Sequence, residues 1–206
     1  LQTALQTYPL QSQLSSLCQR LKHFGIHETG EISTRSQGNP QPLQGHWRFL
    51  LLIYKNFPEI NSIIHTHSVF ATSWAQAKKE IPCFGTTHAD YYFNQIPITK
   101  SLTIKKVNKN YEYETGKSII NKIKNLKIKP LNIPGILVAS HGPFCWGDNS
   151  KKALQNSQTV EYLAKLAYKT KVINNKISSI PRFLQLKHYK RKVGPYSYYG
   201  QKIKGK

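Results

Sequence analysis

The sequence predicts a single α/β domain that begins near residue 50. The length of 206 residues suits one hydrophobic core. Short apolar runs alternate with helix-like segments, which is typical of α/β domains. No apolar run approaches the roughly 18 residues that a membrane span needs, so we expect a soluble protein.

The domain's first half alternates helix and strand. Residues 50–57 predict a helix that ends before Pro58, because the residue preceding a proline is displaced from the helical region. Residues 63–68 predict a strand, and residues 68–79 predict a helix. Residues 81–93 are expected to form a strand followed by a turn.

The second half begins with a helix predicted over residues 109–126, although Gly116 weakens its continuity. The stretch PGILVASHGPFCWG, residues 134–147, predicts an apolar strand that runs into a tight turn at Gly142-Pro143.

A last helix is expected after residue 149. Asp148 or Asn149 is placed to cap it. Its apolar stripe is expected to comprise Ala153, Leu154, Val160, Leu163, Ala164 and Ala167.

The composition changes near residue 49. Residues 1–50 hold eight glutamines and one lysine, whereas residues 51–206 hold six glutamines and 24 lysines. The chain contains no methionine, even at its start, which indicates a fragment. We therefore expect an atypical segment over residues 1–49 and an α/β domain over residues 50–206. The atypical segment is expected to come from a shifted reading frame, from a decayed gene or from a natural polar extension.

The chain is strongly basic, with a formal net charge of +21. A cationic surface attracts phosphates whatever the fold, so a basic nucleic-acid-binding protein is one alternative function. The lysines are scattered singly, however, and not clustered with aromatic platforms. Nucleic acid is therefore not the expected partner, and the charge also suits an anionic substrate.

Three cysteines, Cys18, Cys83 and Cys145, form no CxxC pair. This odd set argues against a disulfide framework and against a thiolate zinc site. No signal peptide is recognisable in the first thirty residues. The expected compartment is the cytoplasm.

Histidines supply the first functional candidates. His65 and His67 share one face of the predicted strand, roughly 7 Å apart at their Cα atoms, which lets both imidazoles reach one metal. His141 is a third candidate, because it stands where a strand runs out into a turn. Three imidazoles with an open position suit a catalytic zinc site, although manganese, cobalt or nickel also accept such ligands. Other histidines compete as ligands: His46, His88 and His188.

Chemistry beside such a metal needs groups that take and return protons. Asp90, one of only nine carboxylate side chains, is a candidate for this proton transfer. A structural role, in which its carboxylate accepts hydrogen bonds from the backbone amides of a turn, is equally consistent with the local sequence. Tyr196, Tyr198 and Tyr199 lie among basic residues, which lower a phenol's pKa and make it a usable proton donor. The alternative for these tyrosines is an aromatic surface anchor.

Five segments carry a family resemblance: IIHTHSVFATSWAQA, IPCFGTTHADYYF, YEYETGKSII, SHGPFCWG and HYKRKVGPYSYYGQ. In this order they closely resemble the L-ribulose-5-phosphate 4-epimerase family of the class II aldolase/epimerase superfamily, over about residues 50–201. The closing tail separates the epimerases from their aldolase relatives.

The resemblance implies a class II aldolase-like fold, in which helices cover both faces of a central, largely antiparallel sheet. It implies zinc-dependent, reversible conversion of L-ribulose 5-phosphate to D-xylulose 5-phosphate by retro-aldol cleavage and aldol rejoining. It also implies a homotetramer with active sites between subunits. A class II aldolase for another sugar phosphate remains an alternative.

The resemblance also assigns site residues. His65, His67 and His141 match the zinc ligands, and Asp90 and Tyr199 match the two acid/base residues. Four residues match further substrate-binding positions: Thr86, Glu112, His188 and Arg191.

The N-terminal part departs from the family pattern. The segments that bind the substrate phosphate are missing, and His46 stands where the family has an aspartate near the metal. Loss of these donors weakens the binding and positioning of a phosphorylated sugar. An inactive remnant of the enzyme is therefore a further alternative.

Overall fold

The computed structural model of the chain describes residues 6–7, 47–192 and 197. Several residues singled out from the sequence lie outside this part of the chain: Cys18, His46, Tyr196, Tyr198 and Tyr199. Within the described part, no helix combines the length and the apolarity that a membrane crossing requires.

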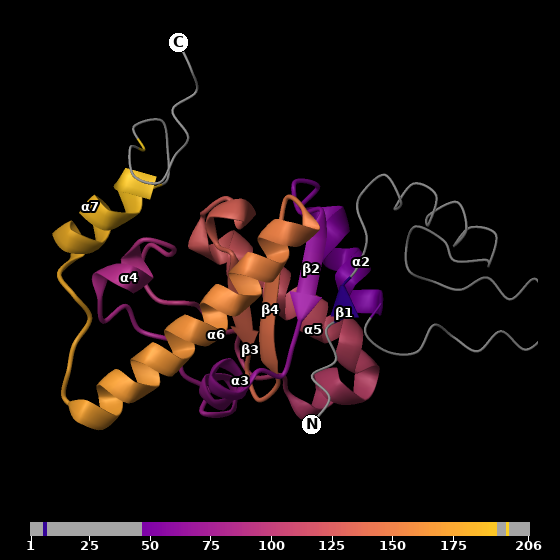
Figure 1. Cartoon of the computed structure of the whole chain (residues 1–206). Coiled ribbons are helices and arrows are strands. Elements are labelled where there is room, and N and C mark those ends of the chain that lie inside the picture. Colours follow the sequence, from indigo (N-terminus) through magenta and orange to yellow (C-terminus); the bar gives the residue numbers. More distant parts are fainter. Residues whose placement is uncertain (1–5, 8–46, 193–196, 198–206) are drawn as a thin grey trace, which may run out of the picture.

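Helices and short strands alternate along the described chain (Figure 1). The elements are β1 (Gln6–Thr7), α2 (Trp47–Asn56), β2 (Ser62–His65), α3 (Val69–Gln76), α4 (Thr86–Ala89), α5 (Ile104–Leu126), the 3-10 helix η1 (Pro130–Asn132), β3 (Gly135–Val138), β4 (Gly142–Gly147), α6 (Ser150–Ile173) and α7 (Arg182–Lys192). The predicted α/β class is confirmed.

The strands form one antiparallel sheet in the order β1-β2-β4-β3. β3 and β4 are joined as a hairpin, and β4 also pairs with β2. In that second pairing, His65 lies opposite Phe144 and Ile64 lies opposite Cys145. This arrangement agrees with the antiparallel central sheet that the resemblance implied.

Helices cover both faces of the sheet. On one face, the ring of Phe144 meets Phe49 of α2 edge to face, with centroids 5.0 Å apart. The next residue of β4, Cys145, points to the opposite face, where its thiol is hydrogen-bonded to Ser157 of α6. α6 runs diagonally past β4 on this side (Figure 1).

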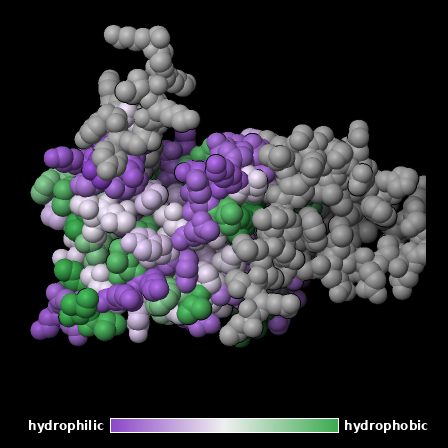
Figure 2. Space-filling model, in the orientation of Figure 1, coloured by the Kyte–Doolittle hydropathy of each residue, from purple (hydrophilic) through white to green (hydrophobic). Residues whose placement is uncertain are grey.

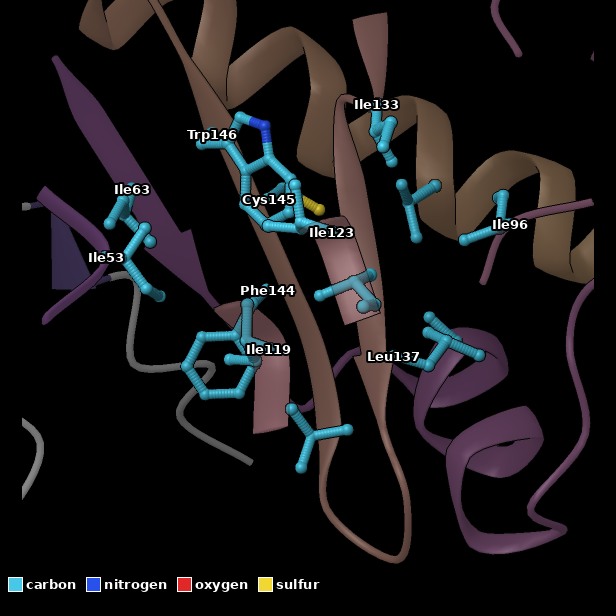
Figure 3. Close-up of a cluster of buried hydrophobic side chains, with 14 of the residues drawn as sticks. Ile53, Ile63, Ile96, Ile119, Ile123, Ile133, Leu137, Phe144, Cys145 and Trp146 are labelled. Carbon is cyan, nitrogen blue, oxygen red and sulfur yellow. The ribbon is translucent and has the colours of Figure 1, made fainter. Parts of the chain in front are cut away.

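The hydrophobic core lies where α2, α5 and the sheet meet. Figure 3 shows part of this core, with Ile53 of α2, Ile63 of β2 and Phe144 of β4 among the labelled side chains. Six of them are almost completely buried: Ile53, Ile63, Ile119, Ile123, Phe144 and Trp146. The indole N–H of Trp146 donates to the carbonyl of Pro130, so this large ring is buried without an unsatisfied donor.

The helix predicted over residues 109–126 is confirmed within α5, and it is continuous through Gly116. A Cβ atom at Gly116 would lie 2.9 Å from the Cα atom of Phe49. The glycine therefore lets α2 and α5 approach closely, and this packing outweighs its low helix propensity. The irregularity in α5 lies instead at Asn110, whose φ and ψ are −171° and 93°.

The strand predicted over residues 63–68 is shorter than expected. β2 ends at His65, and His67 lies in the connection to α3. Ser68 already has the extended backbone of a helix N-cap, so the chain leaves the sheet to begin α3. The predicted strand is therefore too long by three residues, although the backbone N–H of Thr66 still donates to the carbonyl of Pro143 in β4 at 3.4 Å.

The strand expected within residues 81–93 is also wrong. Ile81 makes an isolated bridge to Ile96, and the short helix α4 follows Gly85. Ile81 and Ile96 exchange both of their backbone hydrogen bonds, but no neighbouring pair extends this bridge into a strand among the described residues.

The turn predicted at Gly142-Pro143 lies earlier in the chain. Gly142 and Pro143 belong to β4, and the hairpin turn occupies residues 139–141, where Ser140 has a φ of 62°. Pro143 is tolerated because it stands near the start of its strand.

The helix predicted after residue 149 is confirmed as α6. The side chain of Asn149 caps it by accepting from the backbone N–H of Lys152. Every residue of the expected stripe is buried except Leu154, which is 38% exposed. The helix α7 was not predicted, because its sequence lacks an apolar stripe.

Candidate metal centre

Three histidines meet where β2 ends and the β3–β4 hairpin turns. His65 is the last residue of β2, His67 follows in the connection to α3, and His141 closes the hairpin turn. Each offers a ring nitrogen, and these atoms all lie within 4.8 Å of one another. In the described part of the chain, the competing candidates His88 and His188 do not join this cluster.

The geometry of the cluster fits a metal ion. The Nε2 atoms of His65 and His67 are 3.1 Å apart. Tetrahedral Zn–N bonds of about 2.0–2.1 Å place two ligand nitrogens about 3.3 Å apart, so the spacing is close to that of a zinc site. On its other side, the Nδ1–H of His65 donates to the carbonyl of Pro143 at 2.9 Å, which leaves the lone pair on Nε2.

Packing holds the ring of His65 in place. Its side chain is buried, and its ring stacks on Phe144 with centroids 4.0 Å apart and an interplanar angle of 11°. Because Phe144 is itself held by Phe49, the orientation of His65 is set by the core between the sheet and α2. Buried stacking of this kind preorganises a ligand.

Tyr111 of α5 also contacts the cluster. Its hydroxyl is 3.2 Å from Nδ1 of His141. Glu112, which we expected to bind substrate, is the next residue along α5 and is half-buried. Sequence reasoning missed Tyr111, because the segment YEYETG gives no sign of which tyrosine turns toward a residue thirty positions away.

A second polar cluster joins α4 to α7. Asp90 accepts two hydrogen bonds from Arg191, at 2.9 Å and 2.7 Å, and lies 3.1 Å from Nδ1 of His188. The ammonium of Lys192, which sequence reasoning missed, is 3.9 Å from the same carboxylate. The structure therefore brings together three of the predicted site residues, the aspartate and its two basic partners.

These contacts keep Asp90 ionised. Its side chain is only 12% exposed, and burial by itself raises the pKa of a carboxyl group. The hydrogen bonds from Arg191 and His188, with the charges of Arg191 and Lys192, outweigh burial and hold the pKa of Asp90 below its usual value. Asp90 is thus a carboxylate at neutral pH, able to accept a proton.

The two clusters lie apart within one chain. α4 and α7 are on the side of the molecule away from the turn between β3 and β4 that carries His141 (Figure 1). Thr86 begins α4 and lies on the same side as Asp90. Tyr199, the other expected acid/base residue, lies outside the described residues.

Comparison with known proteins places the chain among related sequences. The profile of the Class II Aldolase and Adducin N-terminal domain family matches residues 15–168. The match begins within residues 1–49, the segment of distinct composition.

Solved structures show the same fold at low sequence identity. An L-fuculose 1-phosphate aldolase superposes with a TM-score of 0.56 at 20% identity, over 72% of this chain and 63% of its own. An L-fuculose 1-phosphate aldolase from Glaciozyma antarctica superposes with a TM-score of 0.52 at 14% identity. The match covers 72% of this chain and 51% of that protein. An aldolase II superfamily protein from Pseudomonas syringae superposes with a TM-score of 0.52 at 14% identity. The match covers 70% of this chain and 53% of that protein. The chain thus spans less than two thirds of the length of these proteins.

Proposed function

Because the chain belongs to the Class II Aldolase and Adducin N-terminal domain family, we propose that it catalyses the zinc-dependent epimerisation of L-ribulose 5-phosphate to D-xylulose 5-phosphate. The observation that carries this proposal is the convergence of His65, His67 and His141. The resemblance of the tail HYKRKVGPYSYYGQ to the epimerases supports the choice of reaction within the family.

The three histidines would hold the metal. An imidazole ligand contributes no negative charge, so three histidines would not cancel the charge of the ion. A bound divalent ion would supply Lewis-acid polarisation of the substrate carbonyl.

Asp90 and Tyr199 would exchange the protons. Inversion at C4 requires that the C4 hydroxyl lose its proton on one side and regain a proton on the other, after the aldehyde fragment has rotated. Asp90 would accept the proton in its ionised form, which the hydrogen bonds from Arg191 and His188 favour, although the same contacts make it a weaker base. Tyr199 would return a proton on the opposite side.

Other described residues suit an anionic substrate. Arg191 is planar and always charged, and with His188 it lies beside Asp90. The net charge of +21 also favours the approach of sugar phosphates. Thr86 and Glu112 would complete the binding residues.

The active enzyme would be a cytoplasmic homotetramer with sites between subunits. Two observations support this arrangement. Asp90 does not join the histidine cluster of its own chain, and apolar side chains are exposed. Hydrophobic residues gather in Figure 2 at the corner where α6 ends. The exposed apolar residues of α6 and α7 include Tyr162, Tyr168, Val172, Ile173 and Phe183.

The test is an enzyme-linked assay for D-xylulose 5-phosphate formed from L-ribulose 5-phosphate by zinc-loaded protein. We expect turnover in the wild type and at least a hundredfold loss in His67→Asn, because the variant removes one metal ligand. No turnover by a folded, zinc-bound protein would refute the epimerase and indicate an inactive remnant.

A class II aldolase for another sugar phosphate is the second candidate, favoured by the names of the aldolases that share the fold. Such an enzyme releases two fragments, whereas an epimerase rejoins them, so trapping of free aldehyde distinguishes the two. A nucleic-acid-binding protein would instead bind nucleic acid with steep salt dependence and equal strength in His67→Asn.

A further inference from the structure

We propose that Tyr111 is a positioning residue for the metal centre, and this inference rests on the metal site of the proposed function. Its hydroxyl would accept the Nδ1–H of His141, which fixes the tautomer of that imidazole and leaves Nε2 as the nitrogen for the metal. The contact that carries the proposal is the 3.2 Å distance from the Tyr111 hydroxyl to Nδ1 of His141.

The neighbouring ligand His65 shows the same arrangement with a simpler partner. Its Nδ1 faces the carbonyl of Pro143, which can only accept a hydrogen bond, so Nδ1 must carry the proton. Its Nε2 then faces His67. Two of the three histidines therefore have Nδ1 engaged by a protein oxygen, one through the backbone and one through a tyrosine.

The local structure of α5 explains why Tyr111 reaches His141. Asn110 has extended rather than helical backbone angles, and its side chain accepts the backbone N–H of Tyr113 at 3.1 Å. This is the geometry of an N-cap, so a new helical segment begins at Tyr111. The break fixes the direction in which the Tyr111 side chain leaves the helix.

Tyr113 provides a matched control on the same helix. Tyr111 and Tyr113 are 39% and 38% exposed, respectively. The ring of Tyr113 faces the ammonium of Lys117 at 5.4 Å and belongs to no histidine contact among the described residues. Removal of either hydroxyl keeps the ring, so Tyr111→Phe and Tyr113→Phe differ mainly in the contact with His141.

The first measurement is the imidazole ¹⁵N NMR spectrum of the metal-free protein above pH 8, with the His141 signals assigned by His141→Asn. We expect the Nδ1–H tautomer in the wild type and in Tyr113→Phe. In Tyr111→Phe we expect a shift toward the Nε2–H tautomer, which is the commoner form of a free imidazole. A spectrum that is unchanged in Tyr111→Phe would overturn the proposal.

The second measurement is the Co²⁺ affinity of the full chain, by competition with a chromophoric chelator. We expect the Kd to rise about tenfold or more in Tyr111→Phe, with an altered visible Co²⁺ spectrum, and less than twofold in Tyr113→Phe. An equal rise of the Co²⁺ Kd in the two variants would overturn the proposed role of Tyr111 but leave the metal centre in place. A wild type that binds no Co²⁺ would refute the metal centre itself, and with it this role.

Discussion

Gly142 is placed against two of the three histidines of the candidate metal centre. A Cβ atom there would be 2.8 Å from the carbonyl oxygen of Thr66, and 3.5 Å from ring carbons of both His65 and His67. The carbonyl belongs to backbone that joins the two histidines, so it has little freedom to move. The glycine is therefore required by close approach and not by an unusual backbone conformation.

Gly142→Ala should weaken metal binding. We expect the Kd for Zn²⁺ to rise at least tenfold and the free energy of unfolding to fall by about 1–3 kcal/mol, because the methyl group displaces residues 65–67. The matched control is Gly85→Ala, where a Cβ atom meets nothing within 4 Å. Equal Zn²⁺ affinity in the two variants, measured by chelator competition, would contradict the role of Gly142.

His88 is a buried histidine outside the metal centre. It is 3% exposed and lies beside the ring of Tyr92. Burial lowers its pKa from 6.5 to about 4, although a hydrogen bond to the backbone of Asn94 opposes the shift. The imidazole is therefore neutral in the folded protein at pH values where an unfolded chain would already be protonated.

Stability should consequently fall as the pH is lowered from 6.5 to about 4. In this range the unfolded chain binds a proton at His88 and the folded protein does not. The free energy of unfolding therefore falls by up to about 1.4 kcal/mol for each pH unit. Denaturant unfolding of the metal-free wild type and His88→Phe at several pH values measures the effect. The difference in stability between them should depend on pH in this window and be constant above it. If the free energy of unfolding changed with pH in the same way in both proteins, His88 would be excluded as the cause of the pH dependence.

At the scale of elements, Glu161 of α6 holds the start of α3. Its two carboxylate oxygens accept the backbone N–H groups of Phe70 and Ala71, each at 2.9 Å. These groups lie in the first turn of α3 and have no partner within the helix, and the negative charge also complements the helix dipole. Because α3 follows His67 directly, this contact fixes the chain where it leaves the metal centre.

Glu161→Ala should destabilise the protein by about 1–2 kcal/mol and also lower metal affinity. Asn149→Ala is the control, because it removes a single cap from the start of α6, at the end of β4 away from the hairpin turn. We expect both variants to lower the melting temperature and only Glu161→Ala to raise the Kd for Zn²⁺. Similar metal affinities in the two variants would show that Glu161 stabilises α3 without affecting the ligands.

At the scale of the whole molecule, a bound metal would link segments that are distant in sequence. His65 and His67 come from the end of β2, and His141 comes from the β3–β4 turn. The unfolded chain does not hold these groups together, so a metal that binds them favours the folded state. The proposed centre therefore has a consequence for stability as well as for catalysis.

Addition of Zn²⁺ should raise the melting temperature of the protein, and a chelator should reverse the rise. Free Zn²⁺ at a hundred times its Kd should stabilise the fold by about 2.7 kcal/mol. Thermal unfolding monitored by circular dichroism measures this shift, with His67→Asn as the control. A shift of the same size in the variant would mean that the metal binds elsewhere.

Several features of this protein could be predicted from its amino-acid sequence alone. The apolar stripe of α6 and its cap at Asn149 follow from local periodicity and short-range hydrogen bonding, so they were predictable. The motifs HTH and SHGPFCWG identified the three histidines that converge in the structure. These features depend on residues a few positions apart, or on motifs that can be recognised in the sequence itself.

The contacts that build the candidate site could not be predicted in this way. β2 ends at His65, so His67 lies in the connection to α3, and His141 reaches both histidines from the β3–β4 turn. The contacts of Tyr111 with His141 and of Asp90 with Arg191 join residues thirty and a hundred positions apart. Such contacts depend on how helices and hairpins pack against one another, and local propensity carries no information about that packing.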